Sequence, residues 1–366
     1  MTLTIPAVAA APTLTAPDPL GRRRRRRRNT AILGTLAGLL VVSAVVGVAI
    51  GPVTVAPGDV VRILTGHLFG WSGDSVDAAA DAIVWEVRLP RVLLGIGVGA
   101  GLAVCGAALQ AMVRNMLADP YLLGINSGAS SGAAVTILFG ITLGLGEHAL
   151  AGSAFLGALA ASVLVFVVAR AAGRITSVRL LLTGVAVGYA LSAVTSFLVF
   201  ASGSAEGARS VMFWLLGSLA LAQWGGPLAA LVVVVLLTVV VLSLWSGRLD
   251  ALAVGDETAL ALGIAPTRFR TQLLVVVALC VGVIVAASGG IGFVGLVVPH
   301  LARRLVGAAH AWAIPASALL GAIFLLWADL LARMLLQPRE LPVGIIAALV
   351  GAPFLLFLIR RLHPSS

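Results

Sequence analysis

The chain has 366 residues, of which 60% are hydrophobic and only 10% are charged, and its mean hydropathy is +1.11. A soluble domain is usually about half apolar and about one quarter charged, because charged side chains cover much of its surface. The composition therefore excludes an ordinary soluble enzyme and favours a polytopic membrane protein. An outer-membrane barrel would show short alternating segments, whereas this chain has long apolar runs such as Leu228–Leu244.

The N-terminal part, residues 1–29, predicts a disordered cytoplasmic tail that ends in seven consecutive arginines, Arg22–Arg28. The apolar run that follows is longer than the core of a typical signal peptide, and no convincing small-residue cleavage site comes after it. We therefore expect a retained first membrane helix whose N-terminus stays in the cytoplasm. The arginine run is explained by membrane topology, so no nucleic-acid partner is expected.

Apolar runs predict about ten membrane-spanning helices between residues 30 and 361, in an all-α fold surrounded by membrane lipid. Two of the runs are short and are joined by Ser288-Gly289-Gly290, so they form either a hairpin or one broken helix. The predicted runs are 31–50, 92–113, 121–143, 149–169, 180–201, 228–245, 271–287, 291–306, 314–332 and 343–359.

The distribution of basic residues predicts the orientation. All 24 basic residues are arginines, and an N-terminus inside the cell places 18 of them in the tail and the inner links and six in the outer links. Loops on the cytoplasmic side carry such an excess of positive charge. Both termini, including the short tail 362–366, are therefore expected in the cytoplasm, and the protein is expected in the cytoplasmic (inner) membrane.

Glycine is abundant, and four glycines recur in the run 92–113: Gly95, Gly97, Gly99 and Gly101. Small residues let membrane helices approach closely. Tight packing is therefore the preferred interpretation of these positions, and a smooth surface for transport is the alternative.

Signatures of catalysis and of nucleotide binding are missing from the sequence. The chain has no lysine and therefore no P-loop, and the Gly-x-Gly-x-x-Gly pattern at 290–295 lies between two membrane runs instead of in a βαβ unit. The five histidines lie in separate links without the spacing of metal ligands, so neither a cofactor nor a metal site is expected. Proton-coupled transporters and membrane-embedded enzymes need ionisable groups deep in the membrane. Asp329 is the main candidate, and it is expected to pair with Arg333 one turn away.

The inner link 248–266 is the most informative connection. Its leucines fit short helices, and Gly255, Gly263 and Pro266 can end them. Such an element on an inner loop suits docking to a soluble partner. A helix that lies passively on the membrane surface is the alternative.

Several motifs resemble the iron-siderophore and cobalamin importer permeases, the FecCD-type transmembrane subunits, over about residues 55–361. They are Arg88-Leu-Pro-Arg91, the stretch 110–129, Gly255–Gly263, Gly290–Arg303, Ala328–Arg333 with Glu340–Gly344, and Gly351-Ala-Pro353. The family-motif positions are Gln110, Asn115, Asp119, Pro120, Gly124, Gly292, Gly295, Pro299, His300, Arg303, Asp329, Pro342 and Gly344. One departure is Met116, where the family usually has proline.

The resemblance implies a type II ABC importer architecture that is not itself an enzyme. Two permease subunits, as a homodimer or as two related chains, would line the pathway, with two cytoplasmic ATPases below and an extracytoplasmic substrate-binding protein above. The expected cargo is a ferric siderophore, with cobalamin or haem as the alternatives.

The resemblance also implies roles for individual residues. Coupling helices at 249–266 would enter the ATPases, and the coupling positions are Leu252, Gly255, Asp256, Glu257, Ala259, Leu262 and Gly263. Arg88, Arg91 and Arg333 would meet carboxylates of the binding protein. Local pairing of these arginines with Glu86 or Asp329 is the alternative.

Overall fold

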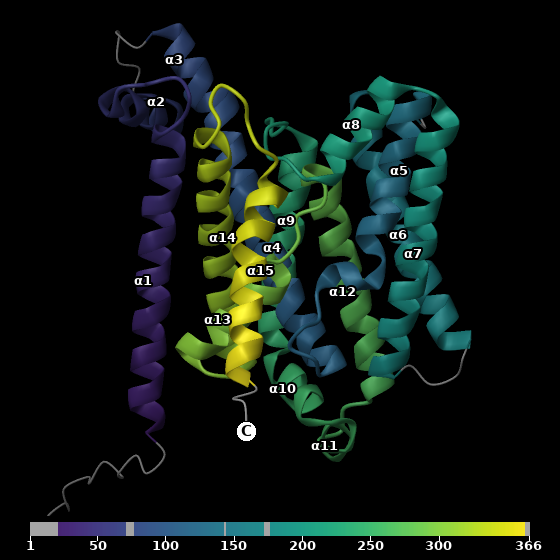
Figure 1. Cartoon of the computed structure of the whole chain (residues 1–366). Coiled ribbons are helices and arrows are strands. Elements are labelled where there is room, and N and C mark those ends of the chain that lie inside the picture. Colours follow the sequence, from purple (N-terminus) through teal and green to yellow (C-terminus); the bar gives the residue numbers. More distant parts are fainter. Residues whose placement is uncertain (1–20, 71–76, 143, 172–175, 363–366) are drawn as a thin grey trace, which may run out of the picture.

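The computed structural model describes residues 21–70, 77–142, 144–171 and 176–362, and all regular structure in this part of the chain is helical (Figure 1). Ten helices correspond one to one to the ten predicted runs, which confirms the predicted all-α polytopic fold. They are α1 (Arg22–Ala49), α4 (Leu89–Val113), α5 (Ile125–Phe139), α6 (Ala149–Ala171), α7 (Ser177–Ser202), α9 (Gly226–Leu244), α12 (Pro266–Ser288), α13 (Val294–Val306), α14 (His310–Met334) and α15 (Val343–Leu362).

Shorter helices lie at the two ends of the bundle. Helix α1 starts, and α15 finishes, at the end of the bundle that carries α10 and α11 (Figure 1). We call it the inner end, because both termini are expected in the cytoplasm. The opposite end, which carries α2, α3 and α8, is called the outer end. The short helices are α2 (Pro57–Phe69), α3 (Ala78–Ala82), the π-helix η1 (Ile83–Arg88), η2 (Pro120–Leu123), η3 (Gly146–His148), α8 (Ala205–Leu215), α10 (Ser246–Val254) and α11 (Asp256–Ala261).

Among the described residues, seven helical stretches are long and apolar enough to cross a bilayer. Two others, α5 and α13, have only 15 and 13 residues, and 13 residues span about 20 Å, less than the roughly 30 Å of hydrocarbon. A break at 289–293 separates α12 from α13, so the two short predicted runs are separate helices. Backbone without helical hydrogen bonds is tolerated inside a membrane only where protein or water covers it, and Gly289 and Ile291 of this break are buried.

The arginine run is helical, which corrects the predicted boundary of the N-terminal tail at residue 29. Helix α1 begins at Arg22, and the seven arginines are exposed on its first two turns. The next residue, Asn29, is buried, and its side-chain amide donates a 2.8 Å hydrogen bond to the carbonyl of Val306 at the end of α13. This bond fixes α1 against the bundle at the inner end. The predicted disorder of residues 1–20 lies outside the described residues.

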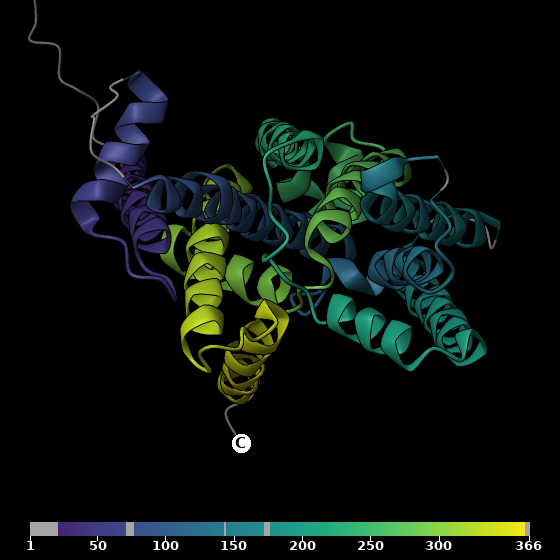
Figure 2. The same cartoon turned by 90° about the horizontal axis from the view of Figure 1, so that it is seen from above.

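Helix α4 is the centre of the bundle, and 83% of its most apolar stretch is buried. Viewed from above, it runs obliquely across the molecule between α14 and α9 (Figure 2). A Cβ atom on Gly99 would lie 2.2 Å from the carbonyl oxygen of Gly321 in α14, and one on Gly97 would lie 2.2 Å from Leu231 in α9. The glycines of α4 therefore serve close helix packing, as the preferred interpretation predicted.

The outward faces of the peripheral helices are apolar. Val41 in α1, Phe200 in α7 and Leu244 in α9 expose 63%, 85% and 78% of their surface. Large apolar side chains so exposed on long helices are stable where lipid replaces water. This pattern is what the prediction of a membrane-embedded bundle requires.

Candidate functional site

The inner link forms two short helices that project from the inner end of the bundle (Figure 1). Helix α10 follows α9 directly, Gly255 separates it from α11, and α12 begins at Pro266. We call residues 246–262 the coupling segment. Its buried residues include Leu249, Leu252 and Ala259, which are fully covered and hold it against the bundle, so it is a packed part of the fold.

Helix α11 ends in a motif that requires glycine. The amide of Ile264 donates to the carbonyl of Ala259, and the amide of Gly263 donates to that of Leu260, which is the hydrogen-bond pattern of a Schellman cap. Gly263 has a φ of +75°, in the left-handed region that other residues adopt only with strain. The predicted turn at Gly263 is therefore a defined helix stop that sets where α12 starts.

The coupling segment carries an exposed apolar surface. Val254, Leu260 and Leu262 expose 72%, 55% and 65% of their surface, and Glu257 is exposed beside them. These side chains belong to α10 and α11, or directly follow α11, the two short helices that project from the inner end (Figure 1). Exposed apolar side chains on such a projection are typical of a surface that docks into a partner.

Two side-chain contacts that the sequence analysis did not foresee join the coupling segment to the bundle. Asp250 of α10 accepts hydrogen bonds from the backbone amide of His310 (3.0 Å) and from its Nδ1 (2.6 Å), at the start of α14. Burial raises the pKa of Asp250 and these two bonds lower it, and the net pKa lies below the usual value. Asp256 of α11 pairs with Arg270 of α12. The partners are 60 and 14 residues apart in sequence, so only the fold brings them together.

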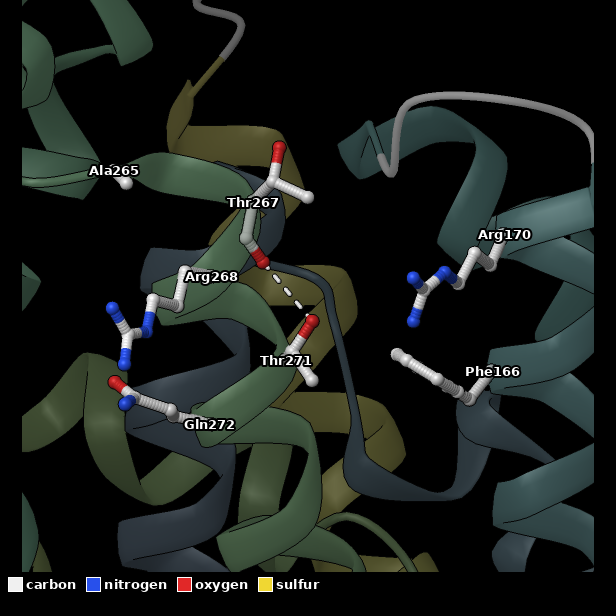
Figure 3. Close-up of a pocket in the computed structure, with 7 residues that line it drawn as sticks. All are labelled: Phe166, Arg170, Ala265, Thr267, Arg268, Thr271 and Gln272. Atoms are coloured by element: carbon white, nitrogen blue, oxygen red, sulfur yellow. Dashed lines mark hydrogen bonds between the residues drawn. The ribbon is translucent and has the colours of Figure 1, made fainter.

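A shallow cleft of about 640 Å³ lies between the ends of α6 and α12 (Figure 3). The Arg170 side chain lies over the ring of Phe166 at 6.0 Å on one side, and the first turns of α12 form the other side. The lining residues are Phe166, Arg170, Ala265, Thr267, Arg268, Thr271 and Gln272. Most of them are exposed, so this cleft belongs to the surface and does not reach the centre of the bundle.

A buried cluster of charges lies near the outer end. Arg91 of α4 binds Asp329 of α14, with Nε and Nη2 at 3.0 and 2.9 Å from Oδ1, and its Nη1 lies 2.9 Å from Glu340. Arg333 lies one turn after Asp329, with its Nε 3.1 Å from Oδ2. The side chain of Asp329 is 2% exposed. The predicted pairing of Asp329 with Arg333 is confirmed, and Arg91 is a second partner that was considered only as an alternative.

The same cluster fixes the outer end of α1. Arg88 donates to the carbonyls of Val48 and Ala49 at 3.0 and 2.8 Å and also to that of Val53. Arg333 donates to the carbonyls of Gly47 and Ile50, both at 3.2 Å. These carbonyls belong to the last turn of α1 and the residues after it, and a helix end leaves such groups without intrahelical partners. Two positive side chains also favour the negative end of the helix.

The family resemblance implies that Arg88, Arg91 and Arg333 meet carboxylates of a binding protein, with local pairing to Glu86 or Asp329 as the alternative. The structure pairs Arg91 and Arg333 with Asp329, and a contact with a binding protein stays a prediction. The three residues expose only 4%, 7% and 3% of their surface. Their donors are used within the chain, by Asp329, Glu340 and the end of α1. Sequence reasoning placed them correctly near one end of the bundle but could not show that folding brings their partners to them. The exposed acidic member of the cluster is Glu340, whose side chain is 37% exposed.

The family-motif residues from three separate stretches meet beside the break at 289–293. The amide of Gln110 in α4 donates to the carbonyls of Gly295 (3.3 Å) and Leu296 (3.2 Å) in α13, and its carbonyl oxygen accepts a short hydrogen bond from Arg303. A Cβ atom on Gly295 would lie 2.7 Å from Pro120. The hydroxyl of Tyr121 accepts a 2.8 Å bond from the amide of Ile291.

The remaining motif residues shape turns and contacts around this junction. Asn115 and Asp119 each accept a backbone amide two residues on, from Leu117 and Tyr121, both at 2.9 Å. Gly124 has a φ of +72° and starts α5. Met116 at the departure from the family pattern is 43% exposed, so the turn forms without proline there.

Later in the chain, Pro299 lies inside α13 and His300 beside it is buried. Gly292 belongs to the break, and Pro342 directly precedes α15. A Cβ atom on Gly344 would lie 2.2 Å from the carbonyl of Leu216, so this position requires glycine. The motifs therefore serve the packing of the junction.

Metal-binding clusters are absent from the part of the chain that the structure describes: no three His, Cys, Asp or Glu side chains are grouped to hold an ion. The features found instead are the projecting coupling segment, the buried charge cluster that holds the end of α1, and the tightly packed junction beside the break at 289–293.

Comparisons with known proteins agree with this arrangement. The chain is 41% identical over 306 residues to the vitamin B12 import system permease BtuC of Vibrio cholerae, covering 84% of this chain and 91% of that protein. It is 42% identical over 281 residues to the hemin transport system permease HmuU of Yersinia pestis, covering 76% and 83%. A solved metal-chelate type ABC transporter in an inward-facing conformation superposes with a TM-score of 0.79 at 34% identity, over 91% of this chain and 99% of that one. The sequence pattern of the FecCD transport family matches residues 39–361, and the chain therefore belongs to this family of ABC importer permeases.

Proposed function

We propose that this chain is the membrane-spanning subunit of an importer that takes up a metal chelate and is driven by ATP hydrolysis on partner subunits. The observation that carries the proposal is the coupling segment, a packed element at the inner end that exposes Leu260 and Leu262. The chain has no lysine, so it has no P-loop of its own. Its partners in this proposal are a second permease subunit, two cytoplasmic ATPases and an extracytoplasmic binding protein.

The mechanism is alternating access. Closure of the two ATPases on ATP moves the coupling segment, and the helices that follow it move with it. Because α10 and α11 are tied to α14 and α12 by Asp250 and Asp256, a displacement of the segment reaches the bundle without passing through a flexible loop. The pathway between the two permease subunits then opens to the other side of the membrane.

The orientation follows the arginine distribution, with the coupling segment and both termini in the cytoplasm. At the outer end, the buried arginines act on docking indirectly. They hold α1, α4 and α14 together and orient Glu340 at the surface. We propose that the binding protein docks on this outer surface, whose shape depends on the cluster beneath it.

The proposed cargo is a ferric siderophore. BtuC and HmuU are named for vitamin B12 and hemin, which are both large metal chelates. Neutral, small side chains line the tightly packed spans, which suits weak contacts with a bulky chelate and selection by the binding protein. Cobalamin and haem are the alternative cargoes, and uptake of each labelled chelate separates the three.

The test uses the permease purified with its ATPases and binding protein and reconstituted in proteoliposomes. The L260S/L262S double variant should lose ATPase binding and ATP-driven uptake, because it removes the apolar contact of the coupling segment. The matched control is L335S/L336S, at the outer end, where the two side chains are 61% and 55% exposed; it should retain ATPase binding. Full uptake by the permease alone, driven by an ion gradient, would overturn the proposal in favour of a secondary transporter.

A further inference from the structure

Arg270 has an unusual environment at the inner end. It lies in the second turn of α12, next to the coupling segment, and it is 2% exposed, the most enclosed arginine in the part of the chain that is described. Its two terminal nitrogens bind the two oxygens of Asp256 in α11, Nη1 to Oδ2 at 2.9 Å and Nη2 to Oδ1 at 2.7 Å. A two-pronged pair of this kind fixes direction as well as distance.

The same guanidinium group reaches two other helices. Nη2 donates to the hydroxyl of Ser177, the first residue of α7, at 3.2 Å, and Nε donates to the carbonyl of Met112 at 3.4 Å. The hydroxyl of Ser177 in turn donates to the same carbonyl of Met112 at 3.1 Å. Met112 precedes the last residue of α4, where carbonyls lack intrahelical donors. One side chain therefore joins α11, α12, the end of α4 and the start of α7.

Burying Arg270 costs free energy, so close packing alone does not account for an arginine at this position. Burying a guanidinium group is unfavourable unless its charge and its donors are matched, and apolar side chains of similar volume often stabilise a fold as well or better. A buried ion pair does, however, impose one geometry on the elements that it joins. A planar, five-donor group can bind four acceptor atoms on three residues at once, whereas the compact ammonium group of lysine cannot reproduce that geometry.

We propose that Arg270 is a positioning residue that transmits movement of the coupling segment to the ends of α4 and α7. When α11 is displaced, Asp256 carries the guanidinium group with it, and the bonds to Met112 and Ser177 carry the ends of two spanning helices. Helix α4 is the buried centre of the bundle, so movement at its inner end reaches its contacts with α9, α13 and α14. The inference rests on the proposed function and adds the residue through which that function is coupled.

The test measures coupling, not only stability. Complexes of the permease with its ATPases and binding protein are reconstituted, and the amount of labelled ferric siderophore imported per ATP hydrolysed is determined for R270K and for D256N. The matched control is R268K, because Arg268 lies two residues away on the same helix but is exposed. We expect R270K to bind the ATPases and hydrolyse ATP, while import per ATP falls about tenfold, equivalent to about 1.4 kcal/mol of coupling; D256N should lower the same ratio. R268K should match the wild type.

Two results would overturn the inference. One is an unchanged ratio of import to hydrolysis in R270K or D256N. The other is a decrease in import that follows only the amount of folded complex, measured from its melting temperature and its chromatographic profile. A further variant, S177A, removes the hydroxyl that links Arg270 to α7 but keeps the ion pair of Arg270 with Asp256. It therefore remains informative where R270K or D256N does not fold, and an unchanged ratio in S177A would overturn the inference in the same way. Failure of the wild-type complex to import with ATP would instead refute the proposed function itself.

Discussion

Arg91 in α4 and Asp329 in α14 are 238 residues apart in sequence, yet two nitrogens of the arginine lie 2.9 and 3.0 Å from one carboxylate oxygen. Asp329 also faces Arg333 at 3.1 Å, so one buried carboxylate balances two buried arginines. This pairing joins two closely packed long helices near the outer end of the bundle. It also explains why arginines accumulate at an end where the distribution of positive charge would disfavour them.

Asp329→Asn should destabilise the permease strongly. The amide retains the size of the side chain but leaves Arg333 buried without a countercharge and Arg91 with only the partly exposed Glu340. The loss of one partner of a buried ion pair typically costs about 3–5 kcal/mol. Chemical denaturation in detergent micelles measures the free energy of unfolding. Glu340→Gln is the control: Glu340 contacts the same Arg91 but is 37% exposed, and loss of such a solvent-screened pair should cost less than about 1 kcal/mol. Equal effects of the two variants would contradict the buried pairing.

Gly99→Ala should loosen the contact between α4 and α14. The added methyl carbon would lie 2.2 Å from the carbonyl oxygen of Gly321, a backbone atom that cannot move aside, and overpacking of this kind costs about 1–3 kcal/mol. The same substitution at Gly38 in α1 meets no atom within 4 Å. Gly38→Ala should therefore leave the melting temperature unchanged or slightly higher. A lower melting temperature for Gly38→Ala than for Gly99→Ala would show that packing is not what requires glycine in α4.

Gly263→Val should weaken attachment of the ATPases by about tenfold or more. Valine in the left-handed region at a φ of +75° is strained by about 1–3 kcal/mol, so the Schellman cap opens and the tip of α11 moves. Gly255→Ala should bind the ATPases normally, because its backbone is extended and the new methyl carbon would make an ordinary 3.6 Å contact with Arg114. Pull-down of the ATPases by each membrane-inserted variant provides the measurement. The structure thus separates two glycines that the sequence presents as equivalent.

The link between Asp250 and His310 should depend on pH through the carboxylate. Because the folded-state pKa of Asp250 is lowered, its contribution to stability is present above the unfolded pKa of about 3.9 and is lost as the pH falls through the lower, folded value. The side chain is 43% exposed, so the contribution should be about 1 kcal/mol or less.

Hydrogen exchange at the start of α14 checks this expectation. Asp250→Asn should speed the exchange of the first amides of α14 at neutral pH. In this variant the exchange rate should also no longer change through titration of the carboxylate below about pH 4. Exchange in Asp250→Asn that matches the wild type at neutral pH would rule out a holding role for the carboxylate.

The sequence by itself determined the order and approximate limits of the long apolar helices. Hydropathy and glycine content are local properties, and each run such as 228–245 or 314–332 meets the requirements of a bilayer without reference to any other part of the chain. The location of the coupling segment was predictable for the same reason, since turn residues such as Gly263 act on their immediate neighbours.

Only the tertiary structure decided which charges are free. The sequence does not distinguish Arg88, Arg91 and Arg333 from exposed arginines. Their partners come from α1, α14 and the segment before α15. Arg270 likewise joins Met112, Ser177 and Asp256, which no spacing rule brings together. A side chain's charge is set by its own chemistry, whereas its burial and its partners depend on which helices pack beside it, and that packing is a property of the whole bundle.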